Sequence, residues 1–167
     1  MLIRYVMFAG VCTLLIALTA GCWKRSKTKT LKLGIIGIEE PVYIEPFAKP
    51  FEAKIDTGAD IASIDAEEIR EIRKNGETFI AFRIRQRGSG ESHEYELPLV
   101  RIIPITRHGM KPQRRFVVMM KIRLGSLFLK KEFSLANRSN FSCQVLIGRN
   151  ILAGNAAVDV REKNTLK

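Results

Sequence analysis

One aspartate stands at the end of an extended segment and at the start of a tight turn, and this arrangement constrains the fold more than any other local pattern. Residues 51–55 alternate apolar and polar side chains, which is typical of a half-buried strand. The strand delivers Asp56, and the small residues Thr57, Gly58 and Ala59 follow at once. Asp, Thr and Gly also favour ordinary turns. The segment is therefore either a plain turn or half of a two-carboxylate catalytic site.

Much of the remaining chain reads as short strands. Residues 79–85 alternate in the same way, and residues 115–124 and 127–135 flank Gly125-Ser126. A two-residue link that begins with glycine favours a β-hairpin. Regularly spaced short strands predict an all-β domain, either a closed or a partly open barrel with one or two short helices.

The clearest helical signal follows the aspartate turn. Asp65 is a good N-cap, Glu68 stands at the third helical position, and Asn75-Gly76 provides a stop. We therefore expect a helix between Asp65 and Asn75, and a second, short helix over residues 149–153. The Glu-Glu-Pro sequence at residues 39–41 is expected to turn the chain.

Residues 1–22 have the pattern of an export segment. Residues 6–20 are almost entirely apolar, and small residues precede Cys22. The run is short for a membrane span and suits a signal peptide, and its end resembles a bacterial lipoprotein box in which Cys22 carries the lipid. The alternatives are an uncleaved membrane anchor and a soluble secreted protein. Residues 23–30 form a basic linker, and residues 31–167 form the folded domain.

The net charge suggests which partners the chain can have. Lys and Arg number 28 against 17 Asp and Glu, which gives +11 at pH 7. Such an excess favours anionic lipid, nucleic acid or acidic peptide, or it is simply a solvated surface. Few aromatic residues are available for base stacking and no nucleic-acid motif is present, so no nucleic-acid partner is expected. The three cysteines have neither disulfide nor zinc spacing, and no metal or cofactor is expected.

Two segments carry a resemblance to a known family. Residues 55–60, Ile-Asp-Thr-Gly-Ala-Asp, resemble the active-site turn of retropepsin-like aspartic proteases, and residues 145–152, Val-Leu-Ile-Gly-Arg-Asn-Ile-Leu, resemble their second motif about ninety residues later. Within this class the chain is similar, over most of residues 31–161, to the bacterial family long labelled "ATP-dependent zinc protease". The sequence lacks a P-loop, and His93-Glu94 lacks the second histidine of a zinc protease motif.

The resemblance implies a catalytic role for Asp56 in a homodimer. Two carboxylates that share one proton can act as base and acid in peptide hydrolysis, and one chain supplies only one Asp-Thr-Gly. The second aspartate would come from a second copy across a two-fold axis. Thr57 would then hydrogen-bond across the axis, Gly58 would let the backbone pass close to the carboxylates, and Ala59 would line the floor of the cleft.

The resemblance also assigns supporting residues. Asp60 and Arg149 would pair and brace the turn, while the strand that contains Leu146, Ile147 and Gly148 would pack behind Asp56. The flap that covers the substrate is expected at the hairpin tip, with the residues Arg107, His108, Gly109 and Met110. If the basic cluster Arg107, Lys111, Arg114 and Arg115 borders that flap, it favours acidic substrate side chains.

The sequence therefore predicts an exported, membrane-tethered aspartic peptidase in the cell envelope, acting on peptide or protein substrates. One alternative is a non-catalytic envelope lipoprotein that binds a peptide by adding a strand on the same scaffold. Another is a basic surface domain that engages anionic lipid or nucleic acid, with a steep salt dependence.

Overall fold

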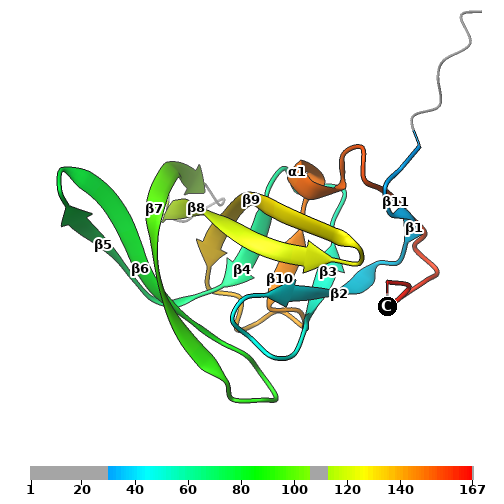
Figure 1. The fold of residues 1–167 in the computed structure, drawn as a ribbon, viewed down its shortest axis with the longest axis horizontal. Helices are drawn as coiled ribbons and strands as arrows, with labels where there is room; N and C mark the ends of the chain where they lie inside the picture. Colours follow the sequence, from blue (N-terminus) through cyan, green and yellow to red (C-terminus); the bar gives the residue numbers. More distant parts are fainter. Residues whose placement is uncertain (1–29, 106–112, 167) are drawn as a thin grey trace, which may run out of the picture.

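The computed structural model describes residues 30–105 and 113–166, which are largely β-strand (Figure 1). In chain order the elements are β1 (Gly34–Ile36), β2 (Glu39–Ile44), β3 (Phe51–Ile55), β4 (Ala62–Asp65), β5 (Glu67–Lys74), β6 (Glu77–Arg85), β7 (Ser92–Ile105), β8 (Gln113–Leu124), β9 (Leu127–Ala136), β10 (Val145–Ile147), α1 (Arg149–Leu152) and β11 (Ala156–Val158). The expected all-β fold is confirmed, and so is the short helix after the second motif.

Six strands close into a barrel in the order β2-β3-β10-β4-β9-β8, because β2 also pairs with β8. The β3–β10 and β4–β9 pairs are parallel, and the other neighbours are antiparallel. The barrel is filled by apolar side chains, among which Val42, Ile64, Leu124, Phe133 and Ile147 are fully buried. β3 has its apolar residues buried and its polar residues more exposed, as its alternating sequence predicts.

The sheet continues beyond the barrel as an arm. β7, β6 and β5 follow β8 in the strand order and project to one side of the molecule (Figure 1). Ile80 and Ile84 of β6 are fully buried, while β5 lies at the sheet edge and exposes most of its charged side chains. Charged side chains on an edge strand oppose pairing with other chains.

The helix predicted between Asp65 and Asn75 is wrong, because residues 67–74 form β5 and pair with β6. Asn75 and Gly76 have φ angles of 51° and 81°, so they form a hairpin turn rather than a helix stop. Positive φ at both central residues is the type I′ geometry that matches strand twist. Glu68 also has a positive φ, 52°, at a register shift in the β5–β6 pairing, which is a bulge rather than a capping position.

Two other turn predictions had different outcomes. The hairpin at Gly125-Ser126 is confirmed, since β8 and β9 pair up to Leu124 and Leu127 on either side of it. The turn predicted at residues 39–41 is wrong, because these residues begin β2. Pro41 is tolerated there because β2 pairs with β8 only from Val42 onward, so at Pro41 the strand has a neighbour on one side only.

The C-terminal segment folds back onto its own chain. β11 pairs with β1 in parallel, and residues 162–166 then run along the start of β2. The fully buried carboxylate of Glu40 accepts hydrogen bonds from the Gly37 N–H (2.6 Å), the Thr165 N–H (3.1 Å) and hydroxyl (2.6 Å), and the Leu166 N–H (2.8 Å). A Cβ at Gly37 would lie 2.4 Å from the Glu162 carbonyl oxygen, so only glycine fits beneath this segment.

Candidate active site

Asp56 follows β3 directly and turns its carboxylate back onto its own loop. Its N–H donates to the Ile147 carbonyl oxygen (3.0 Å), which ties it to β10. Its Oδ1 accepts the N–H groups of Gly58 (2.8 Å) and Ala59 (3.2 Å). A Cβ at Gly58 would lie 3.2 Å from the same oxygen, so a larger residue would crowd the carboxylate. The result is a half-buried carboxylate in a fixed orientation, beside the exposed residues Thr57 and Gly58.

Arg149 holds the backbone of this turn from the start of α1. Its guanidinium donates to the carbonyl oxygens of Thr57 (3.1 Å) and Gly58 (2.9 Å), and it forms an ion pair with Asp60. The Asp60 side chain is 85% exposed, so the ion pair alone contributes little to stability. The two carbonyl contacts are the part of the brace that fixes the loop. The structure thus brings Asp60 and Arg149 together at the position given by the two motifs.

Asn150 makes a second connection, to which the sequence assigned no role. Its Oδ1 accepts the N–H of Ala62 (3.0 Å), and its Nδ2 donates to the Glu132 carbonyl oxygen (2.9 Å). One amide therefore joins the segment after the aspartate turn to β9. The signal that could have found it was its place in the Gly-Arg-Asn motif.

Gly148 and its strand close the space behind the turn. A Cβ at Gly148 would lie 2.7 Å from the Ile61 carbonyl carbon and 2.9 Å from the Ala59 oxygen, so only glycine permits this approach. Ile147 is fully buried, and Leu146 is partly exposed and lines a pocket. The second motif therefore acts on the aspartate turn through backbone contact as well as through Arg149.

That pocket has a volume of about 430 Å³ and lies beside the aspartate turn. Its lining comes from the turn, β4, β7, β8, β9, the segment after β9, β10 and α1: Ala59, Asp60, Ile61, Ser63, Arg101, Ile103, Arg115, Glu132, Ser134, Arg138, Leu146 and Asn150. Three arginines face two carboxylates, one of which, Asp60, already pairs with Arg149. Glu132 pairs with Arg101 at 2.7 Å. The pocket is therefore basic, and we refer to it below as the basic pocket.

The sequence predicted only one of the three pocket arginines. Arg115 belongs to the basic cluster noted in the sequence, whereas Arg101 and Arg138 were missed. Arg138 comes from the segment after β9 and reaches the pocket because β9 pairs in parallel with β4. No local pattern in the sequence marks that pairing.

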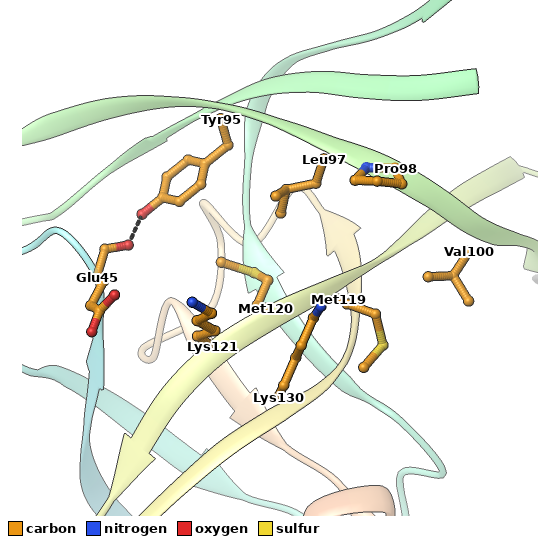
Figure 2. A pocket seen from close by; sticks show the side chains of 9 residues that line it. All are labelled: Glu45, Tyr95, Leu97, Pro98, Val100, Met119, Met120, Lys121 and Lys130. Atoms are coloured by element: carbon orange, nitrogen blue, oxygen red, sulfur yellow. Dashed lines mark hydrogen bonds between the residues drawn. The ribbon is translucent and has the colours of Figure 1, made fainter. Parts of the chain in front are cut away.

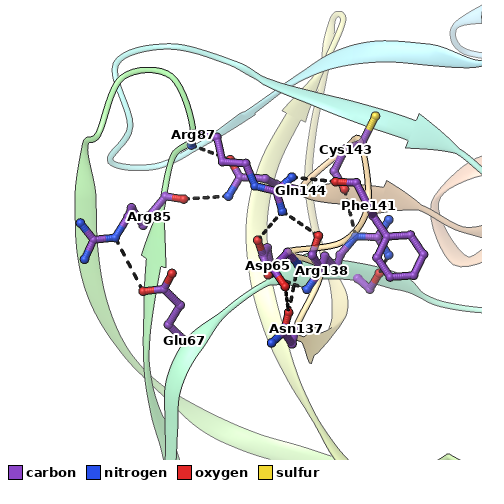
Figure 3. Close-up of polar contacts among 11 residues, drawn as sticks. Asp65, Glu67, Arg85, Arg87, Asn137, Arg138, Phe141, Cys143 and Gln144 are labelled. Atoms are coloured by element: carbon purple, nitrogen blue, oxygen red, sulfur yellow. Dashed lines mark hydrogen bonds and ion pairs between the residues drawn. The ribbon is translucent and has the colours of Figure 1, made fainter.

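Arg138 is a buried cation. It is 7% exposed, its Nε donates to the Cys143 carbonyl oxygen (3.2 Å) and its Nη1 to the Ser63 hydroxyl (3.0 Å). Its backbone N–H donates to Asp65, whose other oxygen pairs with Arg87 (Figure 3). Burial lowers the pKa of Arg138, and the charge of Asp65 acts in the opposite direction. None of the ion pairs among residues 30–105 and 113–166 involves the Arg138 guanidinium, which lies 4.6 Å from the centre of the Phe141 ring.

Other predicted positions lie outside the described residues: the flap residues Arg107, His108, Gly109 and Met110, the cluster member Lys111, and Cys22. The paired ends of β7 and β8, Ile105 and Gln113, bracket the segment that was expected to form the flap. Arg114 has its guanidinium 5.9 Å from the centre of the Phe116 ring and does not line the basic pocket.

Two further observations concern the described part of the chain only. No group of three or more His, Cys, Asp or Glu side chains there could hold a metal ion. Over the same residues, no helix has both the length and the apolar character needed to cross a membrane.

Comparison with known proteins identifies relatives at the family level. The family described as retropepsin-like aspartic endopeptidase RimB matches residues 35–167. A crystal structure of a Legionella pneumophila protein of unknown function (DUF785) superposes with a TM-score of 0.69 at 31% identity, and the match covers 80% of this chain and 98% of that one.

The curated relatives are longer proteins. Two proteins named probable alpha-L-glutamate ligase, from Shewanella pealeana and Shewanella halifaxensis, are each 28% identical over 131 residues. A third with the same name, from Desulfotalea psychrophila, is 24% identical over 128 residues. The matches cover 77% of this chain for the first two but only 29% of their own length.

Proposed function

Since the chain belongs to the RimB-like family of retropepsin-like aspartic endopeptidases, we propose that it is an aspartic peptidase that works as a homodimer. Asp56 of each subunit would meet its copy at the two-fold axis. One carboxylate, ionised, would take a proton from water as the water attacks the peptide carbonyl. The other, protonated, would donate its proton to the carbonyl oxygen and regain it when the tetrahedral intermediate collapses, while the first carboxyl would pass the proton it took from water to the departing amine.

The observation that carries this proposal is the way in which Asp56 is presented. The carboxylate sits at a strand end, is fixed by two backbone N–H donors, and lies on a turn whose neighbours Thr57 and Gly58 are exposed. An ordinary turn aspartate does not require a distant second motif to hold its loop. Here Arg149 and Asn150 do so from about ninety residues away. A rigid, accessible carboxylate suits self-pairing in an isologous dimer.

The basic pocket supports an acidic substrate. It lies next to Ala59 and Asp60, and contains Arg101, Arg115 and the buried Arg138. Arginine binds carboxylates through charge-assisted, often bidentate hydrogen bonds. The curated relatives are named for glutamate chemistry. Because the chain spans less than a third of those proteins, their ligase activity belongs to them, and we propose only that glutamate-rich peptides are the substrates here.

We also propose that the peptidase acts in the cell envelope, held to a membrane by its N-terminal segment. The support is the sequence pattern of residues 1–22 and the cysteine at their end. A lipid on Cys22 or an uncleaved apolar segment would give the same location, and mass spectrometry of the mature N-terminus distinguishes the two.

The direct test is Asp56→Asn, assayed against a library of peptides that contain acidic residues. The variant keeps the size of the side chain but removes the titrating group, so kcat should fall by at least about 100-fold while fold and assembly persist. Asp159→Asn is the matched control: Asp159 pairs with Arg161 and does not line the basic pocket, and its variant should retain full activity.

Substantial cleavage by Asp56→Asn would contradict the catalytic assignment. A wild-type protein that dimerises and binds acidic peptides but cleaves none of them at any acidic or neutral pH would instead support the non-catalytic binding function.

A further inference from the structure

The outer face of the β8–β9 hairpin combines exposed apolar groups with positive charge, and no part of the proposed catalytic mechanism uses it. We define the basic hairpin face as Lys121 and Arg123 of β8 with Phe128 and Lys130 of β9. Lys121 lies directly opposite Lys130 in the strand register, and Arg123 lies opposite Phe128. All four therefore point to the same side of the sheet.

The face is unfavourable for the isolated domain. Like charges directly opposite each other destabilise a strand pair, and the Phe128 side chain is 79% exposed. Arg123 has its guanidinium 3.7 Å from the centre of the Tyr43 ring, which keeps this cation at the surface next to an aromatic group. Cations that surround an exposed phenyl ring are the combination found where proteins lie on anionic membranes.

Two adjoining pockets extend the apolar part of this face. Each has a volume of about 400 Å³, and both are lined by Glu45, Lys121 and Lys130. Figure 2 shows the two lysines beside the first pocket, whose further lining includes Val100 and Met119. Across both linings the described residues supply three cations, Lys121, Arg123 and Lys130, and one carboxylate, Glu45. The surface therefore combines apolar side chains with a net positive charge around them.

The described part of the chain starts close to the turn of this hairpin. A Cβ on Gly125, in the β8–β9 turn, would lie 3.2 Å from Cδ2 of Leu33. Leu33 immediately precedes β1, so the chain reaches the domain at the turn of this hairpin. The eight residues 23–30 span at most about 30 Å when fully extended. If Cys22 is held at a bilayer surface, the hairpin turn is within reach of that surface.

We propose that the basic hairpin face docks on the anionic lipid surface to which the N-terminal segment attaches the protein. Lys121, Arg123 and Lys130 contact lipid phosphates while Phe128 enters the interface. The N-terminal tether keeps the domain close to the lipid surface, and the basic hairpin face sets the orientation of the domain on that surface. This proposal rests on the envelope tether proposed above and is independent of Asp56 catalysis, so the same experiment can be run in the Asp56→Asn background.

The test uses the full chain reconstituted in vesicles, with one tryptophan placed as a probe of depth. The natural chain contains a single tryptophan, Trp23. Trp23→Phe with Phe128→Trp leaves one probe on the hairpin face. Trp23→Phe with Phe141→Trp is the matched control, because Phe141 is also exposed (50%) but follows the opposite end of β9.

In vesicles that contain phosphatidylglycerol, the probe at residue 128 should shift its emission to shorter wavelength and be quenched by brominated lipid. The probe at residue 141 should show neither change. Adding Lys121→Glu and Lys130→Glu should abolish the effect at residue 128, whereas Lys49→Glu, at an exposed position of a different loop, should preserve it.

Three results would overturn the proposal. In the first, the probe at residue 128 keeps a water-like emission although the chain is in the vesicles. In the second, the shift occurs without lipid, which assigns the face to a protein partner or a second copy. In the third, the chain does not associate with vesicles at all, which removes the tether as well. None of these results depends on whether the protein cleaves peptides.

Discussion

Arg149 shows how an exposed side chain can control a site. Its two hydrogen bonds to the carbonyl oxygens of Thr57 and Gly58 fix the loop that orients Asp56, while its ion pair with Asp60 is exposed to water. A charged donor that bonds to two backbone carbonyl groups restrains the loop more than an exposed ion pair between side chains does. Variants of Arg149 and of Asp60 can therefore separate the effect of the two carbonyl contacts from that of the ion pair.

We predict that Arg149→Met lowers the free energy of unfolding by about 1–3 kcal/mol, whereas Asp60→Asn lowers it by less than about 1 kcal/mol. Urea denaturation of both variants measures the difference. Equal losses in the two variants would mean that the ion pair, rather than the carbonyl contacts, holds the loop.

Substrate choice should depend on the basic pocket at the level of single arginines. Arg115→Gln removes a cation from the pocket lining, and charge-assisted hydrogen bonds contribute about 1.5–3 kcal/mol. The ratio of kcat/KM for a glutamate peptide to that for its glutamine analogue should therefore fall about tenfold or more.

Arg114, which precedes Arg115 in the chain, supplies the control for the Arg115→Gln experiment. Arg114→Gln makes the same chemical change at an exposed residue that contacts Phe116 and does not line the pocket. It should leave the ratio unchanged. An equal fall in both variants would show that net charge, and not the pocket, selects the substrate.

At the scale of elements, the Glu40 contacts join the C-terminal segment to the strand pair that presents Asp56. The Ile38 carbonyl oxygen, close to Glu40, accepts the N–H of Ile55 (2.8 Å). Burial raises the pKa of Glu40, but the hydrogen bonds from Thr165, Leu166 and Gly37 outweigh it and hold the pKa below the ordinary value. The ionised carboxylate is therefore the form that the fold stabilises.

We predict that Glu40→Gln destabilises the domain by about 1–3 kcal/mol at pH 7, because an amide cannot accept all of these hydrogen bonds. A carboxyl group with a lowered pKa in the folded state contributes stability above its ordinary pKa of 4.5, and that contribution is lost as the pH falls through the folded value. The difference between wild type and variant should hence narrow below pH 4.5. A difference that stays constant with pH would contradict the role of the charge.

The alternation of apolar and polar residues predicted strands, and the two motifs predicted the aspartate turn, because these patterns are local in the sequence. The alternation in β3 and the Gly125-Ser126 link are of this kind. Asn75-Gly76 was misread because the capping signals at Asp65 and Glu68 competed with it, and the pairing of β5 with β6 decided the outcome. Arg138 and Glu40 could not be assigned from sequence, because their partners Ser63 and Thr165 are brought to them by tertiary contacts.

At the scale of the whole molecule, the proposed homodimer leaves each chain with half of an active site. The described residues hold one Asp-Thr-Gly turn, and the C-terminal segment is folded on its own subunit rather than extended from it. A second copy would therefore add its own complete barrel, with its own basic pocket on the other side of the cleft. Such a dimer would favour substrates with acidic side chains on both sides of the cleaved bond.

The most direct test of the shared site is the activity of mixed subunits. Wild-type and Asp56→Asn chains are combined in equal amounts at constant total protein, and differently tagged copies are co-purified to show that the subunits exchange. If every active site needs two Asp56 carboxylates, about one quarter of randomly formed dimers are active, and activity follows the square of the wild-type fraction. Activity at about one half of the wild-type level, falling in proportion to the wild-type fraction, would show that each chain works alone and would contradict the account.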